Sequence, residues 1–406
     1  PSRFDVMAKY IYASYELAER QTNWHVDLYK SHIGKWNNFY EGEPLKVGYD
    51  AFKEAFHALL ESMRKNGYLK ECAPLPINTV GGIVNGSHRL GTALALNTPV
   101  RARVKQKGKK LSPFFTQLKN SHHLETPYLD HMTYEYAKLK PDTYVTCLFP
   151  SAGQHVEVAE TVINQYATIV AWKDIWLTEG GQLELIRLIY PGEGWVGTPA
   201  NNFRQGRVKQ TLCFPKEKTN RYPLRVYLIE CESHEKTIEM KRAFRELCQI
   251  GNDSMHVNDT HEQTVMIAAS LFNQSSIAFM NRRKRCALPN FDTYFAQLRD
   301  YIEEYELDRE SLCVDTSGVL SAFGLRDCSD IDLLHKGDLP VTSAPIDSHN
   351  GYLKYHAHGL DEILYNPTHH FYYMGIKFAS LDLIRSMKQK RNEQKDRNDI
   401  ALIDAL

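Results

Sequence analysis

The residues best suited to chemistry lie near the C-terminal end of the chain, where Asp330 and Asp332 flank Ile331. On a β-strand, residues i and i+2 point the same way, so both carboxylates would project together while Ile331 and Leu333 enter a core. Two like charges held side by side repel each other unless a cation lies between them. Mg²⁺ and Mn²⁺ prefer carboxylate oxygens, and Mg²⁺ often shares them with substrate phosphates. The pair therefore predicts a metal site with Mg²⁺ or Mn²⁺ as the cofactor.

The elements that must position these carboxylates are predicted from the residues before them. Residues 312–314 are typical of a strand, and Asp315-Thr316-Ser317-Gly318 is a polar turn that leads into a short apolar helix. Gly324-Leu325-Arg326 then separates this helix from the strand that carries the two aspartates. The predicted order is strand, turn, helix and strand.

This order resembles the core of the nucleotidyltransferase superfamily, in which a Gly-Ser turn precedes an Asp-x-Asp strand. The resemblance implies that Asp330 and Asp332 hold metal ions that bind a triphosphate. It also implies that Ser317 and Gly318 form the phosphate-binding turn, although the order of these two residues is reversed in this chain.

A third carboxylate from a later strand completes the metal site in that superfamily. Asp361 is the best candidate for this ligand here, with Glu362 beside it and Asp347 as a further alternative. Residues 378–406 predict a helix whose polar face is either solvated or close to the nucleotide. Its basic residues are Arg385, Lys388, Lys390, Arg391 and Lys395.

An Asp-x-Asp motif also occurs in glycosyltransferases, where it holds a divalent cation against the diphosphate of a sugar nucleotide. Both classes need the same chemistry, because the charge of a departing phosphate must be neutralised. The third interpretation of Asp330 and Asp332 is structural, with both carboxylates ending a strand at a turn. All three interpretations remain open on the sequence alone.

A second candidate phosphate site lies in the N-terminal part, at Gly86-Ser87-His88-Arg89. Short strands are predicted at residues 73–78, 82–86 and 100–104, with a helix at residues 87–96. The motif would then lie on a strand-to-helix turn, where free backbone N–H groups favour an anion. Gly86 would allow close approach, Ser87 would cap the helix, and His88 and Arg89 would donate hydrogen bonds.

This segment resembles the G-x-H-R signature of the ParB/sulfiredoxin superfamily over about residues 70 to 105. The resemblance implies a nucleotide cradle at Gly86 and Ser87, with His88 and Arg89 contacting phosphate. Ser87 stands where a sulfiredoxin has its reactive cysteine, so sulfiredoxin activity is not expected. The structural alternative is a capped helix start with a histidine bonded to a nearby carbonyl.

The middle of the chain is predicted to alternate between strands and helices. Strands are expected at residues 144–149, 167–172, 185–190, 210–214 and 224–229, and helices at residues 156–166 and 236–247. The glycine-rich and basic segment at residues 192–209 suits a loop around a phosphate or sugar, with Trp195 as a stacking face, or a plain connecting loop.

Two polar clusters follow in the middle of the chain. His256, Asp259 and His261 offer metal-ligand types, but Asp259 with Glu262 also fits a capping box at the start of a helix. Residues 282–285 are four consecutive cations, which are more typical of a solvated linker than of a phosphate contact.

Length and composition set the class of protein. A chain of 406 residues exceeds the usual size of one core, and we expect three α/β or α+β domains at residues 1–107, 108–285 and 286–406. The 49 basic and 49 acidic side chains argue against a dedicated DNA-binding protein. No apolar run is long enough for a transmembrane segment, and eight scattered cysteines suggest reduced thiols in a cytoplasmic protein.

These features together predict an intracellular transferase that uses a nucleotide or nucleotide-activated donor. The chain also resembles multidomain proteins that accompany surface-glycan assembly, which implies a sugar, glycan or other small-molecule acceptor. The first hypothesis is phosphoryl or nucleotidyl transfer, and the alternative is glycosyl transfer from a sugar nucleotide. A non-catalytic nucleotide-binding regulator is the third hypothesis.

Overall fold

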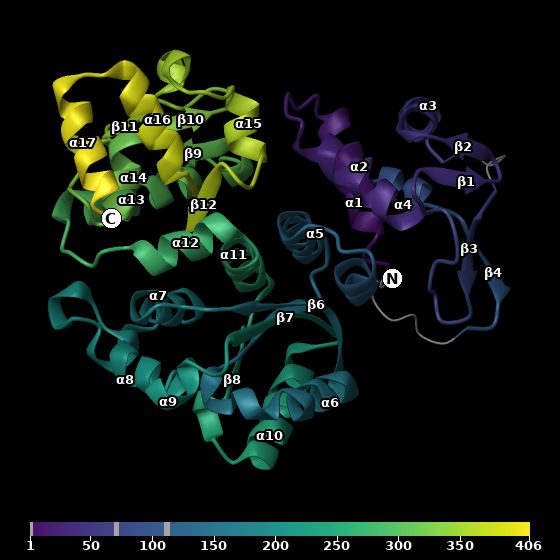
Figure 1. Ribbon diagram of the computed structural model, residues 1–406, viewed down its shortest axis with the longest axis horizontal. Helices are drawn as coiled ribbons and strands as arrows, with labels where there is room; N and C mark the ends of the chain where they lie inside the picture. The colour runs from purple at the N-terminus through teal and green to yellow at the C-terminus, as the bar shows by residue number, and fades with distance from the viewer. Residues whose placement is uncertain (1–2, 69–72, 109–113) are drawn as a thin grey trace. The chain divides into compact units, whose positions relative to one another are not determined.

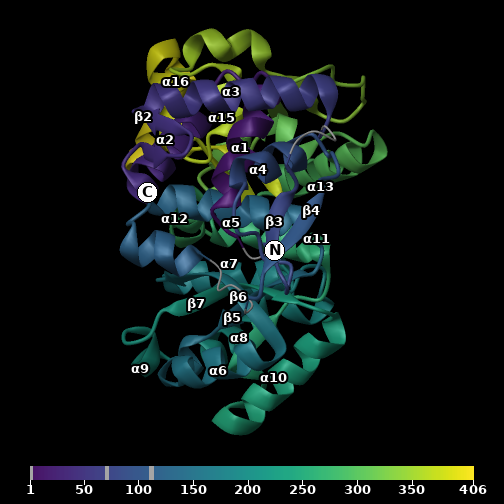
Figure 2. The same cartoon turned by 90° about the vertical axis from the view of Figure 1, so that its right-hand side faces the viewer.

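The computed structural model describes residues 3–68, 73–108 and 114–406, which form two compact units (Figures 1 and 2). The first unit comprises residues 1–140 and the second comprises residues 141–406. Both units combine helices with small β-sheets, so the fold is of the mixed α/β type. Within the described ranges, no helix combines the length and the apolar character needed to cross a lipid bilayer.

The first unit is mostly helical. Its helices are α1 (Val6–Leu17), α2 (Trp24–Asn37), α3 (Tyr49–Asn66), α4 (Ser87–Ala95), a π-helical turn (Gln117–Ser121) and α5 (Thr126–Leu139). Its strands form an antiparallel pair, β1 (Tyr40–Gly42) with β2 (Leu45–Val47), and a parallel pair, β3 (Leu75–Asn78) with β4 (Ala102–Gln106). The core joins α1, α2 and α3 through large, mostly aromatic side chains, which bury much apolar area per residue. They include Tyr12, Tyr29, Phe52, Phe56 and Leu60.

The strand predicted at residues 82–86 is wrong. Only Ile83 pairs, in an isolated antiparallel bridge with Ile77. The side chain of Asn78 accepts hydrogen bonds from the backbone N–H groups of Val80 and Gly82, at 3.1 and 2.7 Å, and so closes a tight turn. The chain therefore folds straight back against β3 before α4 begins.

The second unit begins with a four-stranded antiparallel sheet of order β6-β7-β5-β8. Its strands are β5 (Thr143–Leu148), β6 (Ala167–Ile175), β7 (Leu224–Cys231) and β8 (Met255–Val257). Two amphipathic helices, α6 (Val156–Tyr166) and α10 (His234–Cys248), cover one face of this sheet. Val162 of α6 and Phe244 of α10 pack in one core with Tyr227 and Ile229 of β7.

Two of the strands predicted in this region are wrong, because residues 185–190 and 210–214 belong mainly to helices α7 (Glu179–Ile189) and α8 (Arg204–Cys213). Nearly every residue of α7 after its first turn is buried. A short apolar run of this kind does not distinguish a buried strand from a buried helix. The deciding local feature is Thr178, whose side chain caps α7 by accepting a hydrogen bond from Gly181 N.

Three helices connect the two sheets of the second unit. They are α11 (His261–Leu271), α12 (Gln274–Arg282) and α13 (Pro289–Glu304). A short helix, α9 (Lys216–Thr219), precedes β7. Phe279 of α12 stacks on Phe371 and makes an edge contact with Phe323, so α12 is anchored in the C-terminal sheet.

The basic run that follows α12 is not a solvated linker throughout. Arg283 donates to the Glu184 carboxylate on α7 at 2.7 Å and to the carbonyl oxygen of Ala322 at 2.8 Å. Arg285 donates to the carbonyl oxygen of Gly180 at 2.6 Å. Alternate members of the run therefore tie the two parts of the second unit together, because a buried carboxylate requires cationic partners.

The C-terminal sheet has five strands in the order β11-β10-β9-β13-β12. They are β9 (Leu312–Val314), β10 (Ile331–His335), β11 (Ile346–Ser348), β12 (His370–Tyr373) and β13 (Ile376–Ala379). Strand β10 runs parallel to β11 and antiparallel to β9. The helices are α14 (Thr316–Ala322), α15 (Leu360–Tyr365), α16 (Leu381–Arg391) and α17 (Gln394–Asp404). The predicted order of strand, helix and strand around the aspartates is confirmed. The predicted turn is wrong, because α14 begins at Thr316 and includes Ser317 and Gly318, and Asp330 immediately precedes β10.

The single helix predicted at residues 378–406 is wrong in two respects. Phe378 belongs to β13, and the remaining segment is divided into α16 and α17. Asn392 has a positive φ of 57°, a backbone conformation that ends α16, and Glu393 then caps α17. The break turns α17 back against α16, so that both helices contribute to one cavity.

The seven described cysteines are free thiols, and six of them are buried. This agrees with the prediction of buried, reduced cysteines, and Cys72 lies outside the described residues.

Candidate functional site

A cavity of about 580 Å³ lies beside β10 in the second unit. It contains Asp330, Asp332 and Ser317, so the structure brings three of the predicted site residues together. Its other lining residues come mainly from α14, the segment after β11, and the two C-terminal helices. They are Thr316, Arg326, Ser329, His349, Tyr352, Lys388, Arg391, Lys395, Asn398, Asp399 and Leu402.

The alternation expected of β10 holds over its first three residues, whereas the last two residues of the strand are both buried. Ile331 and Leu333 are buried, whereas Asp332 is only partly buried and lines the cavity. Burial raises the pKa of the Asp332 carboxyl, and the neighbouring charges of Asp330 and Asp315 raise it further against a hydrogen bond from the Thr316 hydroxyl. No side chain of the described residues forms a hydrogen bond or an ion pair with Asp330. Its oxygens are therefore available to a cation.

Four cations surround these carboxylates: Arg326, Lys388, Arg391 and Lys395. Three of them are held in place by two aspartates of α17. Asp399 accepts from Arg326 at 2.6 Å and from Lys388 at 2.7 Å. Asp396 accepts from two guanidinium nitrogens of Arg391, at 2.7 and 2.9 Å.

The charge balance of the cavity favours an anion accompanied by a metal ion. Besides its four cations, the wall carries three carboxylates: Asp330, Asp332 and Asp399. The charge of Asp399 is already compensated by its two basic partners. Asp396 likewise compensates Arg391. A divalent cation at Asp330 and Asp332 would offset the charge of these two carboxylates and leave the four basic side chains in excess of Asp396 and Asp399 by two charges, which suits a polyphosphate.

Thr316, the first residue of α14, connects this helix to Asp332, one of the two candidate metal ligands. Its φ is 45°, a left-handed conformation that is rare for a β-branched residue and costs roughly 1–3 kcal/mol. The hydroxyl of Thr316 bonds the Asp332 carboxylate, and Asp315 N donates to the carbonyl oxygen of Asp332 at 2.9 Å. These two bonds hold the strained residue against β10.

Gly318 has a packing role in the structure. It lies inside α14 and is buried, and an added Cβ would lie 2.6 Å from Cγ1 of Val314 on β9. It is not among the described residues that line the cavity. Ser317, one residue earlier, is the member of the predicted turn that reaches this space.

The predicted third ligand, Asp361, lies on α15 and outside the lining of this cavity. Its carboxylate accepts from Lys336 at 2.9 Å. Asp347 is also not among the described residues that line this cavity, but it is the direct neighbour of Asp332 in the parallel pairing of β10 with β11. Residues in register on parallel strands point to the same face, and Asp347 is exposed there. The register of this pair was not visible in the sequence.

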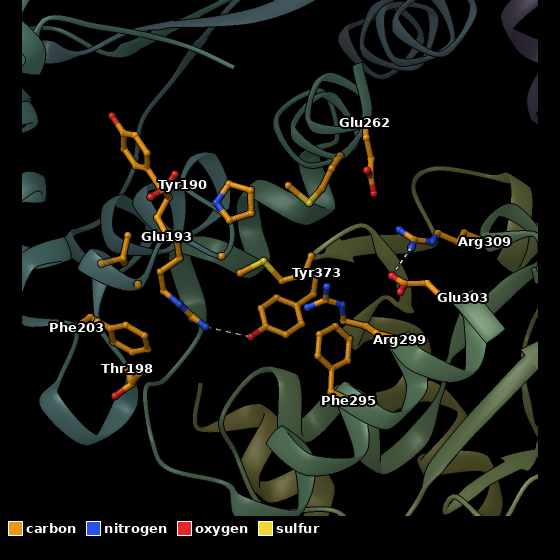
Figure 3. Close-up of a pocket in the computed structure, with 18 residues that line it drawn as sticks. Tyr190, Glu193, Thr198, Phe203, Glu262, Phe295, Arg299, Glu303, Arg309 and Tyr373 are labelled. Carbon is orange, nitrogen blue, oxygen red and sulfur yellow. Dashed lines mark hydrogen bonds and ion pairs between the residues drawn. The ribbon is translucent and has the colours of Figure 1, made fainter. Parts of the chain in front are cut away.

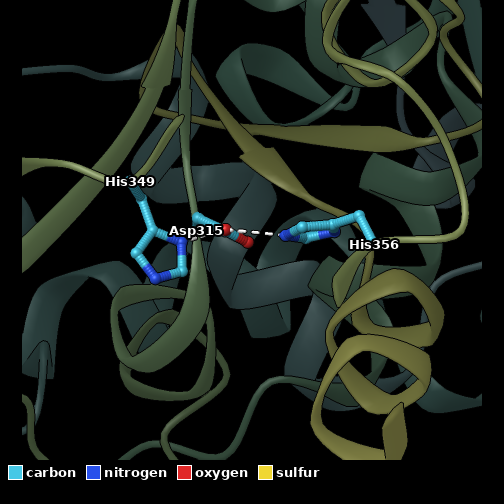
Figure 4. Close-up of side chains that lie close together, drawn as sticks. All are labelled: Asp315, His349 and His356. Carbon is cyan, nitrogen blue, oxygen red and sulfur yellow. Dashed lines mark hydrogen bonds and ion pairs between the residues drawn. The ribbon is translucent and has the colours of Figure 1, made fainter. Parts of the chain in front are cut away.

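A buried polar cluster of Asp315, His349 and His356 lies behind the cavity wall, and sequence reasoning missed both histidines (Figure 4). One oxygen of Asp315, Oδ2, lies 2.7 Å from Nδ1 of His349 and 2.9 Å from Nε2 of His356. Burial opposes ionisation of this carboxyl, but the hydrogen bonds from the two imidazoles hold its pKa well below the ordinary value. Of the two histidines, His349 also lines the cavity. No sequence spacing links residues so far apart in the chain.

The N-terminal motif has contacts within the first unit. Gly86, with a φ of 94°, is the N-cap of α4, so the prediction that Ser87 caps this helix is wrong. His88 Nε2 lies 2.9 Å from the hydroxyl of Tyr29, and Arg89 donates to the carbonyl oxygen of Ala73 at 2.6 Å. Burial, together with the charge of Lys9, lowers the pKa of His88 well below the usual value. His88 is therefore a neutral side chain near pH 7.

A second cavity, of about 590 Å³, includes the glycine-rich loop (Figure 3). Tyr373 lies near its centre in Figure 3, and Arg187 donates to the tyrosine hydroxyl at 3.4 Å. The charged residues that line it balance one another: three arginines, Arg187, Arg299 and Arg309, and three glutamates, Glu193, Glu262 and Glu303. This balance makes it less suited to a polyphosphate than the first cavity. Trp195 is not among its described lining residues and packs edge-on against Tyr190.

The polar cluster around His256 lies at the start of helix α11. Thr260, and not Asp259, is the N-cap of α11, because its hydroxyl accepts from Gln263 N at 3.2 Å. Burial lowers the pKa of His256 to about 3, so its ring is neutral at physiological pH. The three predicted metal-ligand types therefore do not form a metal-binding group among the described residues.

No protein-family model matches this chain, and neither a curated protein nor a solved structure is significantly similar to it. The geometry of the carboxylate-containing cavity is therefore the basis for a functional assignment.

Proposed function

We propose that the second unit is a metal-dependent transferase that moves a phosphoryl or nucleotidyl group from a nucleotide to a hydroxyl group of a small-molecule or glycan acceptor. One observation carries the proposal. Asp330 and Asp332 share a cavity of about 580 Å³ with Ser317 and four basic side chains. Paired carboxylates beside clustered cations suit the joint binding of a divalent cation and a polyphosphate.

The donor set fits Mg²⁺ or Mn²⁺. Asp330 and Asp332 supply carboxylate oxygens, Asp347 stands on the same face of the sheet, and hard cations prefer such oxygen ligands. A bound cation would supply charge neutralisation for the phosphates.

The basic residues would bind and orient the phosphate groups. Arg326, Lys388 and Arg391 are already fixed by Asp396 and Asp399, so little reorganisation is needed when an anion binds. Phosphoryl transfer gains most of its rate from such positioning and from charge neutralisation. Tyr352, which lines the same cavity, offers an aromatic face to a base or sugar.

A sugar nucleotide is the alternative donor, because it carries a diphosphate that could use the same carboxylates and cations. In that case the transferred group would be the sugar. A regulatory protein that binds a nucleotide without turnover is the remaining alternative.

Thermal unfolding with candidate donors distinguishes these possibilities. We expect ATP or CTP, with Mn²⁺, to raise the melting temperature of the full chain by several degrees, because a ligand at 100 times its Kd stabilises by about 2.7 kcal/mol. Without Mn²⁺ the shift should be much smaller. A Mn²⁺-dependent shift with UDP- or CMP-sugars alone would favour glycosyl transfer. No shift with any nucleotide would contradict both transferase assignments.

The N-terminal motif is tested by a double variant, His88→Ala with Arg89→Ala. Because both side chains already bond within the first unit, we expect a loss of about 1–3 kcal/mol in its stability. The Mn²⁺-dependent nucleotide shift of the second unit should be retained. Loss of that nucleotide response in a variant with unchanged stability would instead place the phosphate site at Gly86 to Arg89.

A further inference from the structure

His349 is fixed by contacts on three sides. Its backbone N–H donates to the carbonyl oxygen of Leu333 on β10 at 2.8 Å. Its ring Nδ1 faces Asp315 Oδ2 at 2.7 Å, and its ring plane stacks on Tyr352 with an interplanar angle of 7°. The ring is therefore held in one orientation at the wall of the cavity that contains Asp330 and Asp332.

The contact with Asp315 determines which ring nitrogen carries the proton. An ionised carboxylate only accepts hydrogen bonds, so the Nδ1 atom of His349 must be the donor. In a neutral imidazole the other nitrogen, Nε2, then has a free lone pair. Figure 4 shows this second nitrogen directed away from Asp315. A cavity-lining imidazole with this tautomer has the form of a general base.

His356 completes the arrangement from behind. Its Nε2 donates to the same oxygen of Asp315 at 2.9 Å, and His356 is not among the described residues that line the cavity. A carboxylate held by two imidazole donors is fixed in position and remains ionised. His356 therefore contacts the cavity wall only through Asp315, and the carboxylate of Asp315 is hydrogen-bonded to the cavity-lining ring of His349.

A metal centre is the competing interpretation, because two histidines and a carboxylate can also bind a transition metal. The ligand atoms of the three residues lie within 4.8 Å of one another, as such a centre requires. In Figure 4 the two imidazoles flank the carboxylate, and each nitrogen is at hydrogen-bonding distance from the same oxygen. Two direct hydrogen bonds satisfy that oxygen without an ion, so the distances describe a hydrogen-bonded chain.

We propose that His349 is the general base that activates the acceptor hydroxyl, and that Asp315 is its positioning residue. This inference rests on the proposed transferase function and makes the acceptor an alcohol. The acceptor oxygen forms a new bond to phosphorus. The bond from phosphorus to the leaving group breaks with its electron pair, and this group is the nucleoside diphosphate in phosphoryl transfer or diphosphate in nucleotidyl transfer. The hydroxyl proton passes to Nε2 of His349. The resulting imidazolium is stabilised by the negative charge of Asp315.

Kinetics and binding of His349→Ala provide the test in the full chain. We expect kcat to fall by about 10²–10⁴-fold, while the Kd values for Mn²⁺ and nucleotide change less than about threefold. Added imidazole should restore part of the lost turnover, because the substitution leaves space for a ring. The matched control, His358→Ala, removes an exposed histidine of the same region and should leave all three quantities unchanged.

A spectroscopic measurement tests the same inference without relying on turnover. In the wild type labelled at histidine, nitrogen NMR should show His349 protonated at Nδ1. Asp315→Asn should move the proton to Nε2, because an amide can donate to Nδ1.

Three results would overturn the inference while leaving the proposed function intact. The first is unchanged turnover in His349→Ala, and the second is a wild type in which His349 is protonated at Nε2. The third is zinc that binds tightly to the wild type and is lost from both His349→Ala and His356→Ala. A wild type that binds nucleotide without any turnover would contradict the proposed function itself, and the role of His349 with it.

Discussion

Replacing Asp330 and Asp332 together with asparagine is expected to lower nucleotide turnover by roughly 10³-fold or more, because charge neutralisation by a bound metal contributes several kcal/mol. The same variant should be at least as stable as the wild type in the absence of metal. The two carboxylates lie close together in one cavity, and asparagine removes their mutual repulsion while keeping their size. Steady-state kinetics and thermal unfolding, each with and without Mn²⁺, measure both effects.

The two candidates for the third metal ligand provide matched controls for that experiment. Asp347→Asn should weaken Mn²⁺ binding, because Asp347 is in register with Asp332 on the same face. Asp361→Asn should lower stability through the loss of its bond with Lys336 and leave Mn²⁺ binding unchanged. An asparagine pair at positions 330 and 332 that retained metal-dependent turnover would place the metal elsewhere.

Replacing Arg283 with methionine is expected to cost about 3–5 kcal/mol in the free energy of unfolding, because it leaves Glu184 buried with reduced compensation. Glu184 accepts from both Arg283 and Arg187 at 2.7 Å, and Arg285 lies 3.5 Å away. Methionine retains much of the apolar stem of arginine, so the loss is mainly electrostatic. Denaturant unfolding measures the difference. Arg282→Met, at the exposed neighbouring position, is the control and should change stability by less than about 0.5 kcal/mol.

The same network predicts a dependence on pH. Burial alone would raise the pKa of Glu184, but the charges of Arg283 and Arg187 hold it below the ordinary value of 4.5. A lowered carboxyl pKa stabilises the fold fully above pH 4.5, and this contribution is lost as the pH falls through the pKa of the folded state. The difference in stability between the wild type and Arg283→Met should therefore shrink in acid. An equal difference at every pH would exclude Glu184 as its cause.

The two aspartates of the site could be predicted because the order of polar and apolar residues around them is a local feature of the sequence. Asp330 and Asp332 alternate with buried apolar residues, and a period of two is a local property of a strand. The order of β9, α14 and β10 was predicted for the same reason. The interpretation of residues 185–190 as a strand was wrong because α7 is buried on nearly all sides and shows no polar face.

The residues that sequence reasoning missed depend on contacts between distant segments. His349 reaches Asp315 because β11 pairs with β10, and β10 in turn pairs with β9. Asp347 becomes a candidate ligand through the same register. Neither the contact between His349 and Asp315 nor the register of Asp347 with Asp332 produces a pattern in neighbouring residues of the sequence. The partners of Arg283 were equally hidden, because a run of cations is usually solvated and only the position of Glu184 on α7 shows otherwise.

The most direct test of the central claim is an anomalous-scattering crystal structure of the full chain with Mn²⁺ and a non-hydrolysable nucleoside triphosphate analogue. The proposal predicts a Mn²⁺ peak bound by the carboxylates of Asp330 and Asp332, with the phosphates beside Arg326, Lys388 and Arg391. A nucleotide at Gly86 to Arg89, with no metal at the aspartates, would contradict it.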